Sequence, residues 1–358
     1  MTAISIIGAG PGGLTCARVL QRHGIPVTVY DADPGRDSRN QGGSLDLHDD
    51  NGQIALREAG LLDEFFALAR AEGQEERGLA IDGRLVEHHV PAPGERTKPE
   101  IDRGQLRELL LDSLTPGTVR WGHALASTDG RHLRFTDGTA AEAELIIGAD
   151  GAFSRVRAAV SPAVPRHTGV SFLEAWFDEV ETRHADLSDL VGPGSAHAAD
   201  GERGVFAQRN SGGHIRVYLM RQVPADWLDR AGLSIEDTSS VRAHVLKEFA
   251  AWSPRLRQMI TDNDGPFVDR PIFALPVPHA WPRHPSITLL GDAAHLMPPL
   301  GVGVNLAMLD ASDLALSIAG TATLSEAVQA YEATMRPRST EIAKLLEGGA
   351  QQMLEPKP

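Results

Sequence analysis

Cysteine is almost absent from this sequence, which contains Cys16 and no other. An internal disulfide is therefore impossible, and the composition fits a protein of the reducing cytoplasm. The sequence also lacks a run of about 18 apolar residues, the length needed to cross a membrane. Its apolar start, ISIIGAG, has no basic segment before it and is soon interrupted by glycines, so we expect no signal peptide.

Basic residues are outnumbered by acidic ones, and the formal net charge is −14. A nucleic-acid surface needs a basic stripe, so this charge argues against a nucleic-acid partner. The histidines lack the paired spacing of a zinc site, and the adjacent His88 and His89 lie in a polar segment, so we expect no metal. With 358 residues, of which 42% are hydrophobic, the chain can form two associated domains with a sizeable core.

A glycine-rich turn follows the first apolar run. Residues 4–7 are predicted to form a buried parallel strand, and Gly8, Gly10 and Gly13 follow with the spacing G-x-G-x-x-G. The first glycine permits a tight turn, the second lets the backbone approach a pyrophosphate, and the third lets helix and strand pack closely. The helix predicted after the turn presents free N–H groups to the phosphates.

An acidic residue completes this pattern. A second strand, 26–30, is predicted after the helix, and it ends at Asp31, 23 residues after Gly8. A carboxylate there can accept hydrogen bonds from a ribose hydroxyl. The sequence therefore predicts a dinucleotide site, the alternative being a glycine-rich turn without a ligand.

Two later apolar runs also end in a carboxylate. LIIGADG is predicted to be a strand ending at Asp150, and TLLGD a strand ending at Asp292, with a helix starting near Asn305. A simple hydride-transferring Rossmann enzyme needs the first crossing only, so three such strand ends indicate a larger ligand.

The polar stretch 32–51 is too long for a simple connection between strand and helix. It contains Arg39 and Asp46, and it is either an ordinary surface loop or part of the site. Helices are predicted over 51–70 and 100–114, the second with Arg103 in its first turn. A cation is unfavourable at a helix N-terminus, so Arg103 suggests an anionic partner.

Three motifs together resemble a known family. GAGPGG at 8–13, GADGAFSRVR at 148–157 and GDAAHLMPP at 291–299 are similar to the motifs of group A flavoprotein monooxygenases, the para-hydroxybenzoate hydroxylase type. Within that family the chain most resembles tetracycline-inactivating monooxygenases, through runs such as GGSLDLH at 42–48.

The resemblance implies an α/β fold with a Rossmann-like FAD-binding domain. That domain would comprise residues 1–165 and 276–320, with a second, sheet-based substrate domain at 166–275. Residues 321–358 would form a C-terminal bracing helix and tail.

The resemblance also assigns the cofactor residues. The residues that would contact FAD are Gly8, Gly10, Gly13, Asp31, Asp46, Arg103, Asp150, Asp292 and Pro299. Arg39 would lie where NADPH approaches, and no side chain would be catalytic because the flavin carries the chemistry. The chain departs from the family at PPLGVGVN, which is one residue shorter and has Val302 where glutamine is common, and at Ala32, where arginine often follows the ribose acid.

The substrate half reads as alternating strands. From the residues alone, one face of that sheet is either solvated and charged or lines a pocket. The family's arrangement places Glu174, Phe206 and Arg216 at the substrate, and of these the phenylalanine alone matches the tetracycline-degrading relatives.

The remaining segments are predicted to be mainly helical. Helices are expected over 235–262 and 323–350, and Pro337 should kink or break the second. The tail QQMLEPKP is expected to be frayed.

The sequence thus predicts an FAD-dependent monooxygenase. It would use NAD(P)H and O₂ to hydroxylate a ring-bearing organic molecule through a flavin C4a-hydroperoxide, the substrate being a tetracycline or a related aromatic polyketide. We expect a cytoplasmic monomer with no nucleic-acid or membrane partner. An FAD-binding protein without turnover is the alternative, and an NAD-dependent dehydrogenase is disfavoured because we find no catalytic arrangement of that kind.

Overall fold

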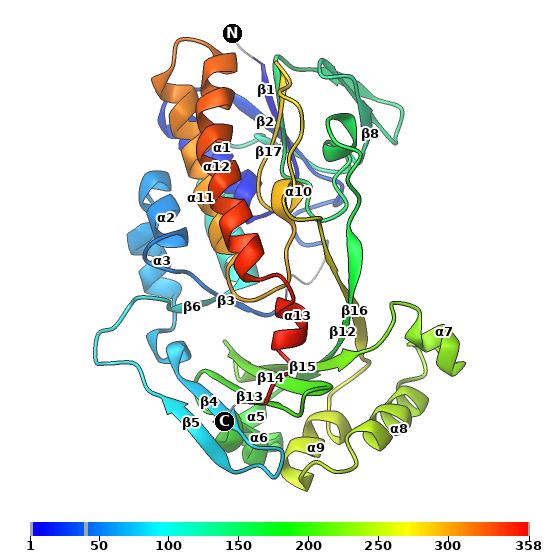
Figure 1. Ribbon diagram of the computed structural model, residues 1–358. Coiled ribbons are helices and arrows are strands. Elements are labelled where there is room, and N and C mark those ends of the chain that lie inside the picture. Colours follow the sequence, from blue (N-terminus) through cyan, green and yellow to red (C-terminus); the bar gives the residue numbers. More distant parts are fainter. Residues whose placement is uncertain (1–2, 39–41, 357–358) are drawn as a thin grey trace.

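The computed structural model describes residues 3–38 and 42–356, and Arg39 lies outside these ranges. The molecule has two layered halves, one above the other in the view of Figure 1. A parallel sheet with its helices forms one half, and a second sheet with small helices on its outer face forms the other. The expected α/β architecture is confirmed.

The parallel sheet has the strand order β17-β11-β1-β2-β7. Its strands are β1 (Ile4–Ile7), β2 (Val27–Tyr30), β7 (Val119–Arg120), β11 (Leu145–Gly148) and β17 (Ile287–Leu289). Every residue of β1, β11 and β17 is buried, as is usual for strands covered on both faces. Because parallel strands end at the same edge, the turns after these three strands meet there, as the sequence predicted.

Helices pack against this sheet, and α1 and α11 lie side by side (Figure 1). The helices of this half are α1 (Pro11–Arg22), α2 (Gly52–Ala59), α3 (Leu62–Leu68), η1 (Ala71–Gln74), α4 (Arg103–Asp112), η2 (Arg157–Ala159), α10 (Asp292–His295), α11 (Gly303–Gly320) and α12 (Leu324–Leu345). A Cβ on Gly12 would lie 3.0 Å from the Ala307 carbonyl oxygen, so α1 and α11 approach too closely for a larger residue.

The helix predicted over 51–70 is divided into α2 and α3. Gly60 separates them with a left-handed backbone, φ 66°, which a glycine adopts without strain. The division turns the chain so that Leu61 and Phe65 are buried in the same core as α2.

Two small sheets complete this half. The strands β8 (Leu125–Thr128), β9 (His132–Phe135) and β10 (Ala140–Glu142) form an antiparallel sheet. The strands β3 (Ser44–Asp46) and β6 (Glu100–Asp102) form a short antiparallel ribbon, in which Asp46 lies directly opposite Glu100. One face of the ribbon, Leu45 and Ile101, is buried in the core, so the polar face points the other way.

The second half is a mixed sheet with the order β16-β12-β15-β14-β13-β4-β5. Its strands are β4 (Glu76–Leu79), β5 (Leu85–His89), β12 (Arg166–Phe177), β13 (Ser195–Ala199), β14 (Arg203–Asn210), β15 (His214–Gln222) and β16 (Val268–Ala274). The expected domain boundaries placed residues 1–165 in the FAD-binding domain, but β4 and β5 add to this sheet. The parallel pairing of β4 with β13 joins segments far apart in sequence, which no local pattern reveals.

Small helices cover the outer face of the mixed sheet (Figure 1). They are α5 (Val180–Arg183), α6 (Ala185–Val191), α7 (Trp227–Ala231), α8 (Thr238–Glu248) and α9 (Pro254–Thr261). Ile215, Val217 and Leu219 are buried against them. The single helical segment expected over 235–262 is interrupted, because the Ser253 hydroxyl accepts from the Leu256 N–H and begins a new helix at Pro254.

The C-terminal region differs from two expectations. Helix α12 continues through Pro337 to Leu345, so the proline does not break it. The chain then turns at Gly348, with φ 79°, and enters the short helix α13 (Gly349–Gln352).

The segment after α13 is docked rather than frayed. Leu354 is 1% exposed and packs with Phe172 and Met220 of the mixed sheet. The Gly201 N–H donates to the Leu354 carbonyl at 2.6 Å, and the Gln351 side chain donates to the Thr168 carbonyl at 2.6 Å. A buried leucine and two backbone hydrogen bonds therefore fix a segment whose polar sequence predicted fraying.

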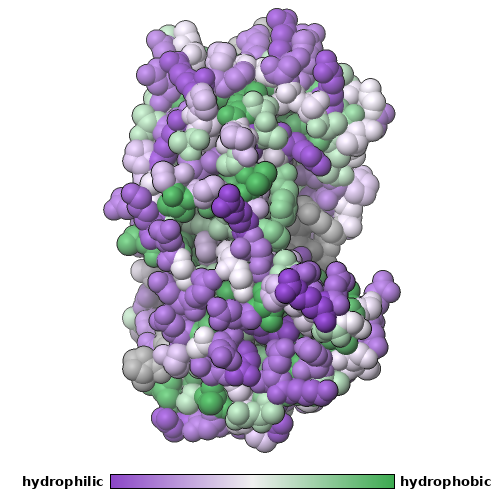
Figure 2. All heavy atoms as spheres, turned by 45° about the vertical axis from the view of Figure 1, so that its right-hand side comes forward, coloured by the Kyte–Doolittle hydropathy of each residue, from purple (hydrophilic) through white to green (hydrophobic). Residues whose placement is uncertain are grey.

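The surface carries few large hydrophobic side chains. On the face shown in Figure 2, hydrophobic residues are scattered among hydrophilic ones. No helix within residues 3–38 and 42–356 is long and apolar enough to span a membrane.

We expect Leu354→Ala to weaken docking of the C-terminal segment by about 2–5 kcal/mol, because it removes a fully buried side chain. Hydrogen exchange at the Gly201 amide and the rate of proteolysis after residue 346 measure this effect. Leu345→Ala is the matched control, since Leu345 is 72% exposed. Equal exchange and cleavage in the two variants would contradict the expected docking.

Candidate functional site

The three glycines of the first turn have different environments. A Cβ on Gly8, whose φ is +109°, would lie 2.3 Å from the Ala149 carbonyl oxygen, and one on Gly13 would lie 2.0 Å from the Gly8 carbonyl oxygen. A Cβ on Gly10 would meet no atom within 4 Å. Gly8 and Gly13 are therefore required for packing, whereas Gly10 leaves open space before the N-terminus of α1.

Asp31 stands where β2 ends and holds this turn. Its carboxylate accepts from the Ala9 N–H at 2.6 Å and from the Asp33 N–H at 2.8 Å. The side chain thereby fixes the loop between β1 and α1. Each oxygen keeps a further lone pair that can accept a hydroxyl.

Asp150 binds the turn that follows it. Its carboxylate accepts from the Ser154 hydroxyl at 2.5 Å and from the Arg155 N–H at 2.7 Å. Burial raises the pKa of this carboxyl, and the hydrogen bonds partly offset that effect. The carboxylate organises the loop after β11 and holds it at the sheet edge.

Asp292 is the third acidic residue at this edge. Its side chain is exposed, but neighbouring protein groups partly desolvate the carboxylate and raise its pKa. The positive charges of His295, Arg103 and Arg157 oppose this rise. Arg103 is exposed at the start of α4, where its N–H donates to the Gly43 carbonyl at 3.0 Å. The site thus presents a cation and a carboxylate to the same space.

Arg157 is a site residue that the sequence reasoning missed. It is 3% exposed and donates to the carbonyls of Asp292 at 3.3 Å and Ala293 at 3.1 Å. Arg157 belongs to the segment after β11, and its hydrogen bonds therefore hold the turn after β17 against that segment. Its place in the run GADGAFSRVR was the available signal.

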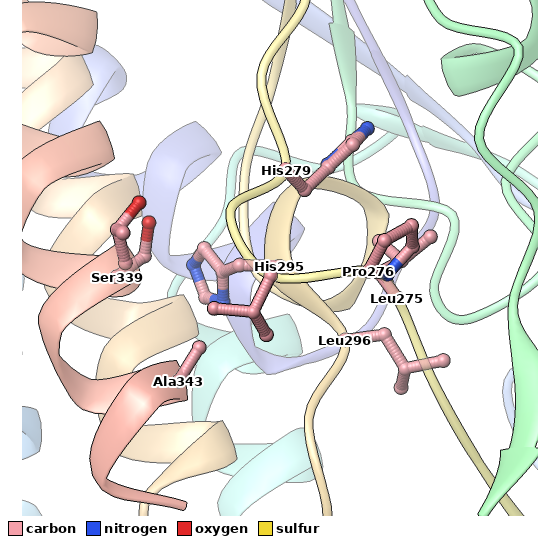
Figure 3. Close-up of a pocket in the computed structure, with 9 residues that line it drawn as sticks. Leu275, Pro276, His279, His295, Leu296, Ser339 and Ala343 are labelled. Carbon is pink, nitrogen blue, oxygen red and sulfur yellow. The ribbon is translucent and has the colours of Figure 1, made fainter. Parts of the chain in front are cut away.

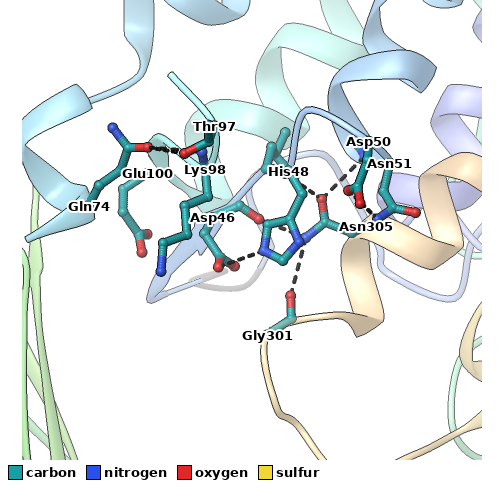
Figure 4. A network of polar contacts seen from close by, with 12 residues as sticks. Asp46, His48, Asp50, Asn51, Gln74, Thr97, Lys98, Glu100, Gly301 and Asn305 are labelled. Atoms are coloured by element: carbon teal, nitrogen blue, oxygen red, sulfur yellow. Dashed lines mark hydrogen bonds and ion pairs between the residues drawn. The ribbon is translucent and has the colours of Figure 1, made fainter. Parts of the chain in front are cut away.

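Asn305 joins two loops of the site (Figure 4). Its amide nitrogen donates to the carbonyls of Asp46 at 2.8 Å and Gly301 at 3.2 Å, and its oxygen accepts from the N–H groups of His48 at 2.8 Å and Gly52 at 3.3 Å. The sequence placed Asn305 only at a helix start, although it holds Asp46 beside the 298–302 loop. Pro299 lies exposed in that loop.

The histidine of GDAAH has a structural role. His295 Nε2 lies 2.5 Å from Asp310 Oδ2, and Arg338 donates to Asp310 Oδ1 at 2.8 Å. Asp310 also accepts from the Gly291 N–H at 3.2 Å. Desolvation alone would lower the pKa of His295, but the interaction with the Asp310 carboxylate outweighs it and raises this pKa. The charges of His295 and Arg338 lower the pKa of Asp310 despite its burial.

A small pocket lies beside this cluster, between the end of α10 and α12 (Figure 3). Its volume of about 10 Å³ is enough for one water molecule at most. His279 closes one side, with Nδ1 2.5 Å from the Ala294 carbonyl and Nε2 3.0 Å from the Ser161 hydroxyl. This pocket is too small for an organic substrate.

The inner face of the mixed sheet carries the expected substrate residues. Glu174, Tyr218 and Phe206 lie directly opposite one another on β12, β15 and β14, and Trp176 and Arg216 lie on the next rung of the same face. The Phe206 and Tyr218 rings are stacked at 6.4 Å with an interplanar angle of 27°. Tyr218 belongs to this set, although the sequence-based selection omitted it.

This face points towards the cofactor half. The Arg216 guanidinium packs against Gly42, where an added Cβ would lie 2.1 Å from it, and the Tyr218 hydroxyl lies beside Gly43. Arg216 is 8% exposed. The alternative of a solvated, charged face is therefore wrong at Arg216, because Gly42 of the other half of the molecule covers this side chain.

The two expected polar substrate contacts bind each other. Arg216 and Glu174 form an ion pair at 3.0 Å, and Arg270 contacts the second Glu174 oxygen at 3.1 Å. Phe206 remains half-buried on the same face. The structure brings all three residues together.

Glu100 is a buried acid at the junction of the two halves. It accepts from the Gln208 amide at 3.0 Å and is hydrogen-bonded to the Ser44 hydroxyl. Desolvation raises its pKa to about 7, and Asp46 adds to the rise. No local sequence pattern points to it, because Glu100 and Gln208 are distant along the chain.

Within the described residues, no group of three or more His, Cys, Asp or Glu side chains could hold a metal ion.

Comparisons with known proteins identify a matching family. A family profile described as an FAD binding domain matches residues 1–254 and 279–345. The monooxygenase penA of Penicillium thymicola is 32% identical over 407 aligned positions, which cover 96% of this chain and 93% of penA.

Two solved structures share the fold. HpxO from Klebsiella pneumoniae, complexed with FAD and uric acid, has a TM-score of 0.81 at 24% identity and covers 99% of this chain and 88% of HpxO. The tetracycline destructase Tet(55) has a TM-score of 0.75 at 20% identity and covers 99% of this chain and 91% of that protein.

We expect Asp310→Asn to destabilise the fold by about 3–5 kcal/mol, because it removes the counter-charge of buried His295 and Arg338.

The raised pKa of His295 implies stability that is full below pH 6.5 and falls as the pH rises through the folded value. The lowered pKa of Asp310 implies stability present above pH 3.8 and lost below it. Urea unfolding between pH 5 and 9 should show the alkaline fall in the wild type and a flatter profile in the variant. Parallel profiles would refute this role.

We expect Gly10→Ala to fold normally but to bind FAD about tenfold more weakly or worse, since its backbone (φ −80°, ψ 176°) suits alanine and the methyl would enter the open space. Gly320→Ala, at the far end of α11 and equally free of neighbours, is the control. Flavin retention after desalting and the melting temperature are the measurements. Wild-type FAD affinity in Gly10→Ala would show that the phosphates bind elsewhere.

Proposed function

The chain belongs to the group A flavin monooxygenase family, and on this premise we propose that it inserts one oxygen atom of O₂ into a ring-bearing organic substrate at the expense of NAD(P)H. The reaction consumes NAD(P)H, a proton, O₂ and substrate, and yields NAD(P)⁺, water and the hydroxylated product. One observation carries the proposal: the edge where β1, β11 and β17 end faces the aromatic inner face of the mixed sheet, across Gly42 and Gly43.

The residues at the sheet edge fit an FAD molecule. The open space at Gly10 lies before the N-terminus of α1, where free N–H groups suit a pyrophosphate. Asp31 has acceptor capacity for the adenosine ribose, and exposed Arg103 supplies a cation beside Asp292. When bound, FAD takes electrons from NAD(P)H and activates O₂.

Protein groups around this edge hold its geometry. Arg157 fixes the turn that carries Asp292, and Asn305 fixes Asp46 against the 298–302 loop. A site held by buried hydrogen bonds keeps a reacting ring and a substrate aligned, which is the main contribution a protein makes to cofactor chemistry.

The substrate would lie against Phe206 and Tyr218. Their rings lie nearly parallel, with centroids 6.4 Å apart, and both pack against the buried cluster that includes Phe172, Met220 and Ala350 of α13. Apolar walls exclude water from the reacting atoms. The likeness to Tet(55) supports a tetracycline or related aromatic polyketide as the substrate, and the likeness to HpxO supports a smaller ring.

A second candidate is an FAD-binding protein without turnover. The shortened 300–304 loop favours it, because Val302 stands at the start of α11 where the resembling enzymes carry glutamine. This protein would bind FAD and consume no NADPH with any ring substrate.

The test is mass spectrometry of tetracycline incubated with enzyme, FAD and NADPH, beside a control without enzyme. We expect a product heavier by one oxygen atom, with NADPH consumed in proportion. If tetracycline is unchanged, a panel of aromatic polyketides and small heterocycles follows. Flavin binding with no product and no ring-stimulated NADPH oxidation across the panel would favour the second candidate.

A further inference from the structure

The inner face of the mixed sheet contains a charge cluster whose arrangement bears on substrate choice. Glu174 lies between two arginines, with one carboxylate oxygen on Arg216 at 3.0 Å and the other on Arg270 at 3.1 Å. Glu174 and Arg216 each have 9% of their side chain exposed, whereas Arg270 has 55%. The buried part of the cluster is therefore a neutral ion pair, and water screens the outer charge.

Arg216 is held in place on three sides. Glu174 binds its Nη1, the Trp176 ring lies 4.8 Å from its guanidinium carbon, and the Gly42 backbone abuts its edge. Arginine recognises carboxylates by presenting a free fork of N–H groups. Here Glu174 contacts the guanidinium at Nη1 and neutralises its charge, while the buried Nε has no hydrogen-bond partner in the described part of the chain. A substrate carboxylate that approached Nε would therefore meet a guanidinium whose charge is already balanced by a carboxylate of the protein.

Other acidic groups face the same sheet. Asp46, Glu100 and Asp102 lie on the polar face of the β3–β6 ribbon, where Glu100 accepts from Gln208 and Asp102 from the Ser211 N–H. Arg70 is the cation among them, paired with Asp102 at 3.2 Å. An anionic ligand would meet this acidic ribbon on one side and Glu174 on the other.

The uncharged part of the face is aromatic. Phe206 and Tyr218 are half-buried and stacked, and the Tyr218 hydroxyl lies beside Gly43 with no hydrogen bond to a residue that the structure describes. A flat ring can stack on such a wall, and a hydroxyl can donate to a carbonyl on that ring. The face therefore offers aromatic contact and a neutral hydrogen bond, and its buried cation, Arg216, is already paired with Glu174.

We propose that Glu174 is a specificity-determining residue that makes this site select uncharged flat rings and reject anionic ones. The inference rests on the proposed function, because it assumes that this face binds the ring to be oxygenated. Glu174 acts by neutralising the charge of Arg216 and by repelling a second carboxylate, so its removal should admit anions rather than abolish binding.

The first test uses the wild-type holoenzyme and two probes of the same ring and size, 2-naphthamide and 2-naphthoate, with binding measured by calorimetry. We expect the amide to bind at least tenfold more tightly. Equal affinity, preference for the carboxylate, or no binding of either probe would overturn the proposal. This comparison requires no variant to fold.

The second test is Glu174→Gln. It removes the negative charge beside Arg216 while preserving side-chain size, so affinity for 2-naphthoate should rise at least tenfold and affinity for 2-naphthamide should stay within threefold. Arg270→Gln is the matched control, because it leaves the buried pair intact and should retain the wild-type preference. An unchanged ratio in a folded Glu174→Gln protein, verified by its melting temperature, would refute the role of Glu174.

The flavin content and NADPH oxidation of the same samples separate this inference from the proposed function. Normal probe selectivity in a protein that never oxygenates a ring would leave the role of Glu174 standing and reject monooxygenase turnover. Oxygenation of a ring without probe selectivity would support monooxygenase turnover and reject the role of Glu174.

Discussion

A single buried carboxylate sets the position of the third strand end. Asp310 is 1% exposed, and its oxygens are bound by the Gly291 N–H, by His295 and by Arg338. A buried charge without partners is costly, so these contacts are fixed once α11 packs against the sheet. Because Gly291 directly precedes Asp292, the packing of α11 and α12 determines where Asp292 stands.

The same logic applies to the other two carboxylates of the edge. Asp31 is committed to the Ala9 N–H and Asp150 to the Arg155 N–H, so each holds its own turn rather than projecting freely. The sequence suggested that these acids would contact a ligand. In the structure these carboxylates also stabilise the loops that follow β1 and β11 through hydrogen bonds.

Specific side-chain contacts join the two halves. Arg216 packs on Gly42, Tyr218 approaches Gly43, and Gln208 binds Glu100. Leu300 of the 298–302 loop packs against Gly349 of α13. A Cβ added to Gly349 would lie 2.4 Å from Leu300 Cδ1. Cofactor loop, substrate sheet and C-terminal segment therefore meet at one place, so a change in any of them alters the shape offered to a ring.

Local patterns by themselves determined the glycine-rich turn and the buried strands β1, β2, β11 and β17 of the cofactor half. The spacing of Gly8, Gly10 and Gly13 and the acids after each buried strand depend on neighbouring residues, and parallel pairing then brings them to one edge. The strands and the alternation of β15 were predictable for the same reason. The break at Ser253 has a visible signal in the Ser-Pro pair, which the prediction of one helical segment over 235–262 overlooks.

Only the tertiary structure decided which groups are paired across the chain. It placed β4 beside β13, docked Leu354 on the mixed sheet, and joined Glu174 to Arg216 and Glu100 to Gln208. Periodicity reports which face of an element is apolar, but not what covers the polar face. Burial and charge pairing depend on that covering surface, so the inner face of the mixed sheet is determined by packing between segments that are distant along the chain.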